Sequence, residues 1–168
     1  MGRRHSAEEE YYQALRNNDK ERIQKALERL LVKDPLAAYG AGKESGNRAV
    51  CVHSLENLMK IDLRLGYRIA TENREEEVLE RHAVNAYIAG RKSRDLETIR
   101  VARTFFVRTD PVRAYIMGWG SEDPQMRHEA GRVLVNSDPL TAYGLGNIYA
   151  DRELIRAAAV RLDSKRSA

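Results

Sequence analysis

The sequence predicts an all-α fold, a right-handed α-α superhelix (solenoid) of about six helical hairpins with a repeat of ~28 residues. Three observations support this prediction. The segment DPLTAYGLG at 138–146 nearly repeats DPLAAYGAG at 34–42 and, more loosely, DPVRAYIMG at 110–118. Tyrosines recur at an interval of 28 residues. No segment shows the sustained alternation of a β-strand.

The repeats are counted from the tyrosine of this motif, which we call the anchor. Two trios of anchors are each spaced by 28 residues and separated by 20: Tyr11, Tyr39 and Tyr67, then Tyr87, Tyr115 and Tyr143. The predicted organisation is one α-solenoid domain over residues 1–168 with short tails at 1–7 and 164–168. Its six repeats lie near 11–38, 39–66, 67–86, 87–114, 115–142 and 143–163.

The first helix of a repeat carries the anchor. Asp-Pro at 34–35, 110–111 and 138–139 is a helix start, because Asp is a good N-cap and Pro is tolerated at the first helical position. Most repeats have a glycine three residues after the anchor, although glycine costs about 1 kcal/mol against alanine inside a helix. The recurring glycine therefore predicts a close approach of a neighbouring helix.

The second helix begins eight residues after the anchor, where an N-cap residue recurs: Asp19, Asn47, Asp95, Asp123 and Asp151. Its apolar residues have helical spacing, as in Ile23, Ala26, Leu27, Leu30 and Leu31. Each repeat is therefore predicted to be an αα-hairpin. One hairpin cannot bury its own apolar face, so the hairpins must stack.

The third repeat, 67–86, is eight residues short, and no Asp-Pro start precedes the next anchor in VLERHAVNAYIAG. We expect either a bend or one fused longer helix here, dividing two halves of three repeats. The alternative is that a loop has merely been trimmed.

The hairpins resemble two known repeat families. AYGLGNIYADRELIRAAAVRLD at 142–163 resembles a tetratricopeptide hairpin, although the period of 28 is shorter than that family's 34. DRELIRAAAVRL at 151–162 is similar to HEAT-type helices. The resemblance covers most of 11–163 at the level of architecture only. It implies a curved scaffold that binds a partner along one face, usually without catalysis.

Composition limits the class of protein. One cysteine, Cys51, excludes an internal disulfide and favours a reducing compartment. No apolar run is long enough to span a membrane, and no secretory signal is recognisable, so we expect a cytoplasmic protein with no membrane partner. The start MGRRHS fits the short myristoylation pattern, which also occurs by chance. The net charge of +4 permits nucleic-acid binding without requiring it.

The sequence contains no specific catalytic or metal-binding constellation. The four histidines, at 5, 53, 82 and 128, are far apart and lack a zinc spacing with cysteine. Cys51 occupies the position of Ile23 and Ile99 in their repeats, which predicts a core residue. The anchor tyrosines could stack bases, but their fixed place beside Ala and Gly favours packing. We expect no enzyme activity, metal or cofactor.

One pair resembles the aromatic-plus-carboxylate arrangement of some HEAT-like DNA glycosylases. Trp119, the only tryptophan, precedes Asp123 by four residues. Asp123 is already explained as a repeated N-cap, so a cap is the favoured interpretation. Trp119 has no such explanation, and we expect it to be exposed at a hairpin turn.

A possible basic stripe is the main functional feature. Arg100, His128 and Arg156 stand thirteen residues after the last three anchors, and the first two repeats have Gln24 and Val52 there. Further along the same helices are Arg103, Arg132 and Arg161. A stripe of this kind suits phosphates or an acidic protein segment. The alternative is a solvated face of mixed charge, because Glu129 and Glu153 share these helices.

Two functions are therefore compared. We expect a non-catalytic scaffold that binds a protein or peptide partner on one face. The alternative is a HEAT-like protein that binds DNA or RNA phosphates with the C-terminal Arg/His stripe. The candidate binding residues are Arg100, Arg103, His128, Arg132, Arg156, Arg161 and Trp119.

Overall fold

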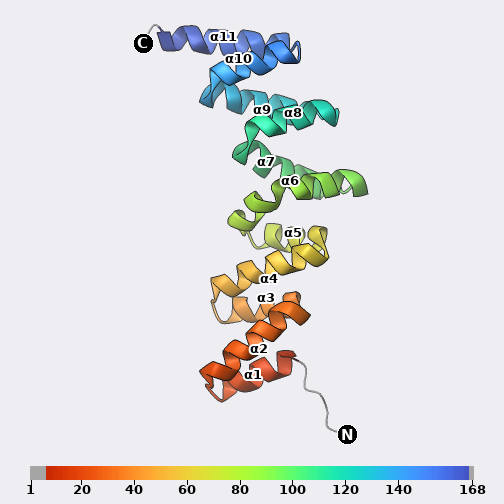
Figure 1. The fold of residues 1–168 in the computed structure, drawn as a ribbon, viewed down its shortest axis with the longest axis vertical. Coiled ribbons are helices and arrows are strands. Elements are labelled where there is room, and N and C mark those ends of the chain that lie inside the picture. Colours follow the sequence, from red (N-terminus) through yellow and green to blue (C-terminus); the bar gives the residue numbers. More distant parts are fainter. Residues whose placement is uncertain (1–6, 167–168) are drawn as a thin grey trace. The chain divides into compact units, whose positions relative to one another are not determined.

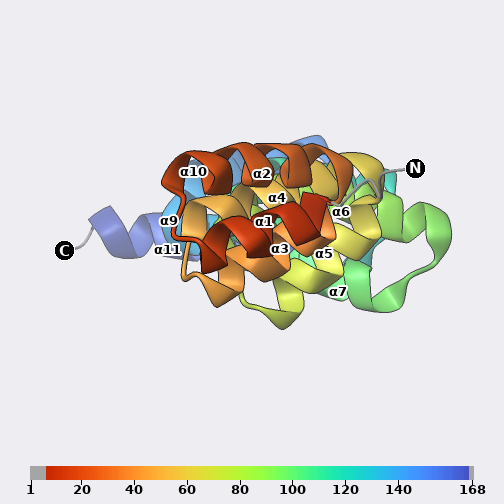
Figure 2. The same cartoon turned by 90° about the horizontal axis from the view of Figure 1, so that it is seen from below.

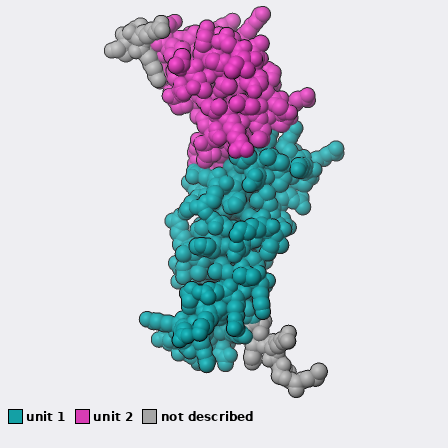
Figure 3. Space-filling view, in the orientation of Figure 1, with its two compact units in different colours: residues 1–98 teal, residues 99–168 magenta. Residues whose placement is uncertain are grey.

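The computed structural model describes residues 7–166, with side chains to residue 164. These residues form eleven α-helices and no strand, which confirms the all-α prediction (Figure 1). The chain divides into two compact units, an N-terminal unit of residues 1–98 and a C-terminal unit of residues 99–168 (Figure 3). The myristoylation pattern at residues 1–6 lies outside the described residues.

The N-terminal unit contains six helices, α1 (Ala7–Arg16), α2 (Lys20–Lys33), α3 (Pro35–Glu44), α4 (Arg48–Ile61), α5 (Leu63–Glu72) and α6 (Glu76–Ser93). Helices α1 and α2 form the first hairpin and lie side by side (Figure 2). Helix α7 (Leu96–Thr109) begins at the end of this unit. The C-terminal unit continues with α8 (Pro111–Gly120), α9 (Pro124–Ser137), α10 (Pro139–Ile148) and α11 (Arg152–Arg166).

The predicted caps start the helices. Asp34, Asp110 and Asp138 each accept a hydrogen bond from the backbone N–H three residues later, and each is followed by Pro at the first helical position. The second helices start at the other cap residues in the same way: Asp19, Asn47, Asp95, Asp123 and Asp151. Asp123 is therefore a helix cap.

The same turn joins the two helices in all six repeats. The residue seven positions after each anchor has a positive φ, and the next residue donates its N–H to the carbonyl three positions after the anchor. The residues with positive φ are Asn18, Gly46, Arg74, Arg94, Glu122 and Ala150. Only one of them is glycine, so composition does not reveal the turn, and the periodic position does.

The recurring glycine brings the second helix of its own hairpin close. A Cβ on Gly146 would lie 2.8 Å from Ile155 Cγ1 and 3.1 Å from Ile155 N, and a Cβ on Gly118 would lie 2.8 Å from Arg127 Cγ. Gly42 has the same relation to Cys51, whose Sγ is 2.9 Å away. The prediction of a close helix approach is confirmed.

Cys51 itself is 4% exposed, as predicted for a core residue. Burial raises the pKa of its thiol.

The anchor tyrosines pack in the interior and join successive hairpins. The first five are 5% exposed or less. Tyr39 donates to Glu75 Oε1 over 3.3 Å, and Tyr115 donates to Asp151 Oδ2 over 2.8 Å. Both acceptors stand at the start of the second helix of the next repeat, 36 residues further on. The anchor is therefore a packing residue that also links one repeat to the next.

The shortened third repeat ends in a fused helix. Residues 78–90, VLERHAVNAYIAG, lie within the 18-residue α6, so the second helix of the third repeat continues into the first helix of the fourth. The fused-helix form of the prediction is therefore confirmed. The missing eight residues removed the helix break, not only a loop.

Paired glycines in α10 test the close approach. Gly146→Ala is expected to lower the free energy of unfolding by about 1–3 kcal/mol, because its Cβ has no room against α11. Gly144→Ala is the matched control, because no atom lies within 4 Å of its Cβ position. That change is expected to stabilise by up to about 1 kcal/mol. Urea unfolding measures both, and equal effects would contradict the assignment.

The fused helix also predicts a pH dependence. Burial lowers the pKa of His82, with Arg81 and Lys60 acting in the same direction, and its buried Nε2 has no hydrogen-bond partner among the described residues. The unfolded chain therefore binds the proton more tightly, so His82 contributes a loss of stability as pH falls below about 6.5. His82→Gln should reduce the loss of unfolding free energy between pH 7.5 and 5.5. The exposed His53→Gln should leave that slope unchanged, and equal slopes for all three proteins would refute the assignment.

Candidate partner-binding groove

Arg100, His128 and Arg156 hold equivalent places in the C-terminal unit. Each is the fifth residue of its helix, α7, α9 and α11 respectively, and each side chain is exposed. Equal positions on successive second helices share an orientation. These three residues are thus compatible with a row of basic groups.

The other three arginines of the predicted stripe do not form a second row. Arg103, Arg132 and Arg161 are the eighth, ninth and tenth residues of α7, α9 and α11, so each step turns the side chain by about 100°. Arg132 and Arg161 are exposed. Arg103 differs, because its side chain is only 11% exposed.

Arg103 lies between two carboxylates. Its guanidinium is 3.6 Å from Asp123 Oδ2 and 3.6 Å from Glu129 Oε2. Asp123 is itself 6% exposed, and its Oδ1 accepts the N–H of Met126 at the start of α9. The structure therefore places Arg103 in an interior ion pair that stabilises the start of α9, and not on the surface of a stripe.

Trp119 lies at the end of α8 and is half-buried, so the expectation of an exposed indole is wrong. The guanidinium of Arg127 lies 4.1 Å from the centroid of its ring on one side. The ring of Tyr149 stacks on it with centroids 5.5 Å apart and planes 15° apart. Tyr149 in turn meets Tyr115 edge-on. This cluster packs the turns of the last two hairpins together.

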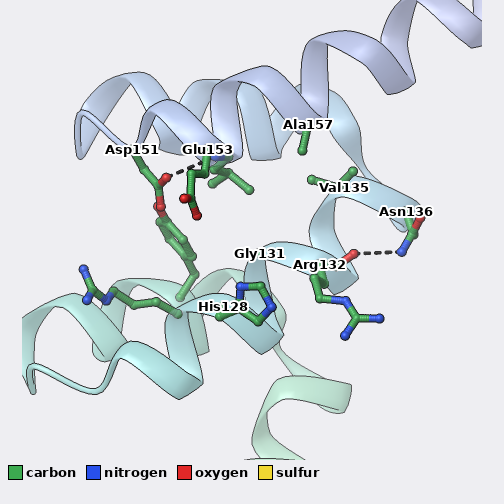
Figure 4. Close-up of a pocket in the computed structure, with 11 residues that line it drawn as sticks. His128, Gly131, Arg132, Val135, Asn136, Asp151, Glu153 and Ala157 are labelled. Atoms are coloured by element: carbon green, nitrogen blue, oxygen red, sulfur yellow. Dashed lines mark hydrogen bonds between the residues drawn. The ribbon is translucent and has the colours of Figure 1, made fainter.

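A groove opens between α9 and α11 (Figure 4). It encloses about 190 Å³. Its wall on α9 carries His128, Arg132 and Val135, and its wall on α11 carries Glu153 and Ala157. All of these residues belong to the C-terminal unit.

Gly131 is one of the residues that line the groove. Counted from the anchor, it stands where the first two repeats have the buried leucines Leu27 and Leu55. Leu154 of α11 packs closely on this glycine, with its Cδ1 3.2 Å from the Cβ position of Gly131, so a larger side chain has no room there.

The groove is lined by both charges and by apolar groups. Tyr115 forms part of it and donates to Asp151, which also accepts the N–H of Leu154. Burial raises the pKa of Tyr115 to about 12. The hydrogen bond to Asp151 acts in the same direction, while the indole of Trp119 opposes it. The Glu153 carboxylate points into the space across from His128 (Figure 4).

The sequence predicts the basic side of the groove but not its acidic and apolar sides. His128 and Arg132 line it, whereas Arg100, Arg156 and Arg161 do not. From the sequence alone, Glu153 is expected only to reduce the positive charge of the stripe. The first two repeats have leucine where the fifth has Gly131, but the others have Ala83, Arg103 and Ala159, so this position does not by itself predict the groove.

Among residues 7–166, no cluster of three or more His, Cys, Asp or Glu side chains is arranged to hold a metal ion. No helix in that range combines the length and apolar character needed to cross a membrane. Comparison with protein-family models, curated protein sequences and solved structures returned no match.

The interior placement of Arg103 gives a test. Arg103→Leu should lower the free energy of unfolding by about 3 kcal/mol, because it removes the guanidinium that faces the buried Asp123 carboxylate. Arg132→Leu removes the same charge from an exposed site and should change it by no more than about 0.5 kcal/mol. Denaturant unfolding of both variants measures this. A change of no more than about 0.5 kcal/mol for Arg103→Leu would contradict a stabilising interior ion pair.

Proposed function

We propose that this protein is a non-catalytic helical-repeat scaffold that binds a short peptide segment of a partner protein in the groove between α9 and α11. The observation that carries the proposal is the groove between α9 and α11, which combines the charged side chains of His128, Arg132 and Glu153 with apolar ones. The proposal includes right-handed stacking of the hairpins within each unit. It also includes a reducing, cytoplasmic setting, which suits the single buried cysteine.

The size and lining of the groove define the segment. A cavity of about 150 Å³ holds a benzene ring, so a groove of this volume accommodates one side chain the size of leucine or phenylalanine. Val135, Leu154 and Ala157 supply apolar contacts for it. In the peptide, an acidic residue on one side of this apolar side chain would face His128 and Arg132. A basic residue on the other side would face Glu153.

The second candidate function is binding of nucleic-acid phosphates. The equivalent, exposed positions of Arg100, His128 and Arg156 favour it. Asp151 and Glu153 in the adjoining groove weigh against it, because carboxylates repel a phosphate backbone. The mixed lining favours the peptide.

A peptide library displayed on phage, selected against the full chain, tests the proposal. Enriched peptides should share one large apolar residue flanked by an acidic one, and should bind with micromolar affinity. Ala157→Leu, which fills the groove, should weaken them by at least about tenfold, a loss of 1.4 kcal/mol. Ala49→Leu is the control, since Ala49 is an exposed alanine on α4 in the N-terminal unit.

The full chain and the variants Arg156→Ala and Ala157→Leu also test the second candidate function, nucleic-acid binding. Duplex DNA and single-stranded RNA of random sequence should bind no tighter than about millimolar at low salt. Tight binding that falls steeply with added salt, and is lost on Arg156→Ala but retained by Ala157→Leu, would replace the peptide proposal with the nucleic-acid one.

A further inference from the structure

Each hairpin has two faces along the stack. In the first hairpin, Tyr11, Ala26, Leu27 and Leu30 form the face that the next hairpin covers, which we call the trailing face. Ala38, Ala41 and Val50 of the second hairpin pack against it, and we call their surface the leading face. The contact is made by small or apolar residues on both sides.

The last hairpin, α10–α11, has an uncovered trailing face. Its anchor, Tyr143, is 40% exposed, whereas the other five anchors are 5% exposed or less. Leu162 of α11, the equivalent of Leu30, is half-buried, whereas the residues at this position in the other repeats are buried. Ala158, the equivalent of Ala26, is buried.

The first hairpin has a leading face of the opposite character. The residues equivalent to Ala38, Ala41 and Val50 are Glu10, Gln13 and Arg22. Glu10 forms an ion pair with Arg29 over 3.0 Å, and Arg22 is 75% exposed. Within the described residues, the leading face of α1–α2 is therefore polar, and we call it the polar cap, whereas the trailing face of α10–α11 is apolar.

We infer that the trailing face of α10–α11 docks a helical hairpin of a partner protein. The occupant can be inferred from the contacts within this chain, because each earlier hairpin covers its trailing face with the next hairpin. The docking hairpin presents small or apolar residues at three positions. They are equivalent to Ala142, Leu145 and Leu154, which are buried in the last hairpin of this chain. It also carries a carboxylate at the start of its second helix, to accept the Tyr143 hydroxyl as Asp151 accepts that of Tyr115.

A second copy of this chain does not fit as that occupant. Stacking α1–α2 of one molecule on α10–α11 of another would bury Glu10 where every later repeat has a small residue, Ala38, Gly66, Ala86, Ala114 or Ala142. Burying this carboxylate and its ion-pair partner Arg29 takes two charges out of water, which is unfavourable. The polar cap therefore prevents head-to-tail polymers of this chain.

The full chain itself supplies a probe of known chemistry. The triple variant Glu10→Ala, Gln13→Ala, Arg22→Val gives the first hairpin the leading face of the second, and Asp19 already stands at the position of Asp151. We expect the wild type to sediment as a monomer at about 100 µM, and the triple variant to associate head to tail at the same concentration.

Adding Tyr143→Glu to the triple variant should weaken this association by at least about tenfold, because it buries a charge and removes the anchor contact. Adding Val32→Glu is the control, because Val32 on α2 is 75% exposed and lies outside both faces. Circular dichroism of all variants checks that each is folded. A folded triple variant that remains monomeric would overturn the inference. A wild type that dimerises through Tyr143 would also overturn it, by making a second copy the occupant.

Discussion

The close contact between the two helices of a hairpin, which most repeats make where a glycine lacks a Cβ, is the constraint on which the geometry of the C-terminal unit depends. Gly118 lets the start of α9 approach α8, so that Arg127 Cγ lies against its backbone. The guanidinium of Arg127 then reaches the ring of Trp119. In the same turn Asp123 is placed to cap α9 and to pair with Arg103. The missing methyl group at Gly118 thus makes room for Arg127 and the aromatic cluster, whereas the same turn and cap also form in the first repeat, which has Ala14 at this position.

Function is expected where a repeat departs from this pattern. A groove lined by both charges and by apolar groups opens between α9 and α11. The absence of a covering hairpin leaves Tyr143 exposed, while the other anchors are buried. Both departures occur in the C-terminal unit. The N-terminal hairpin departs differently, by carrying Glu10 and Arg22 on a face that is apolar in later repeats.

Periodicity made the scaffold predictable. Caps, anchors and close-contact glycines each serve one local purpose, so the same residue types recur at the same positions, and the structure places them as expected. Side-chain direction was harder to predict. Arg103 and Arg132 differ by one position in their helices, and that single step separates an interior ion pair from an exposed side chain.

The groove could not be derived from one repeat. Its lining residues come from both α9 and α11, and they can be brought together only once the two helices are known to touch. Trp119 was likewise unpredictable, because its partner Tyr149 lies in the next repeat and in no recurring position. Contacts within a repeat can be predicted from residues that recur at one position. Contacts between repeats depend on two positions at once and are harder to predict in this way.

The most direct test of the account is amide hydrogen exchange of the full chain, with and without a saturating peptide enriched from the library. Binding in the groove predicts slower exchange in α9 and α11, with no change in α2 and α4, which have leucine where α9 has Gly131. Protection confined to α2 and α4, or to the first helices α8 and α10, would contradict the central claim that the groove beside Gly131 is the binding site.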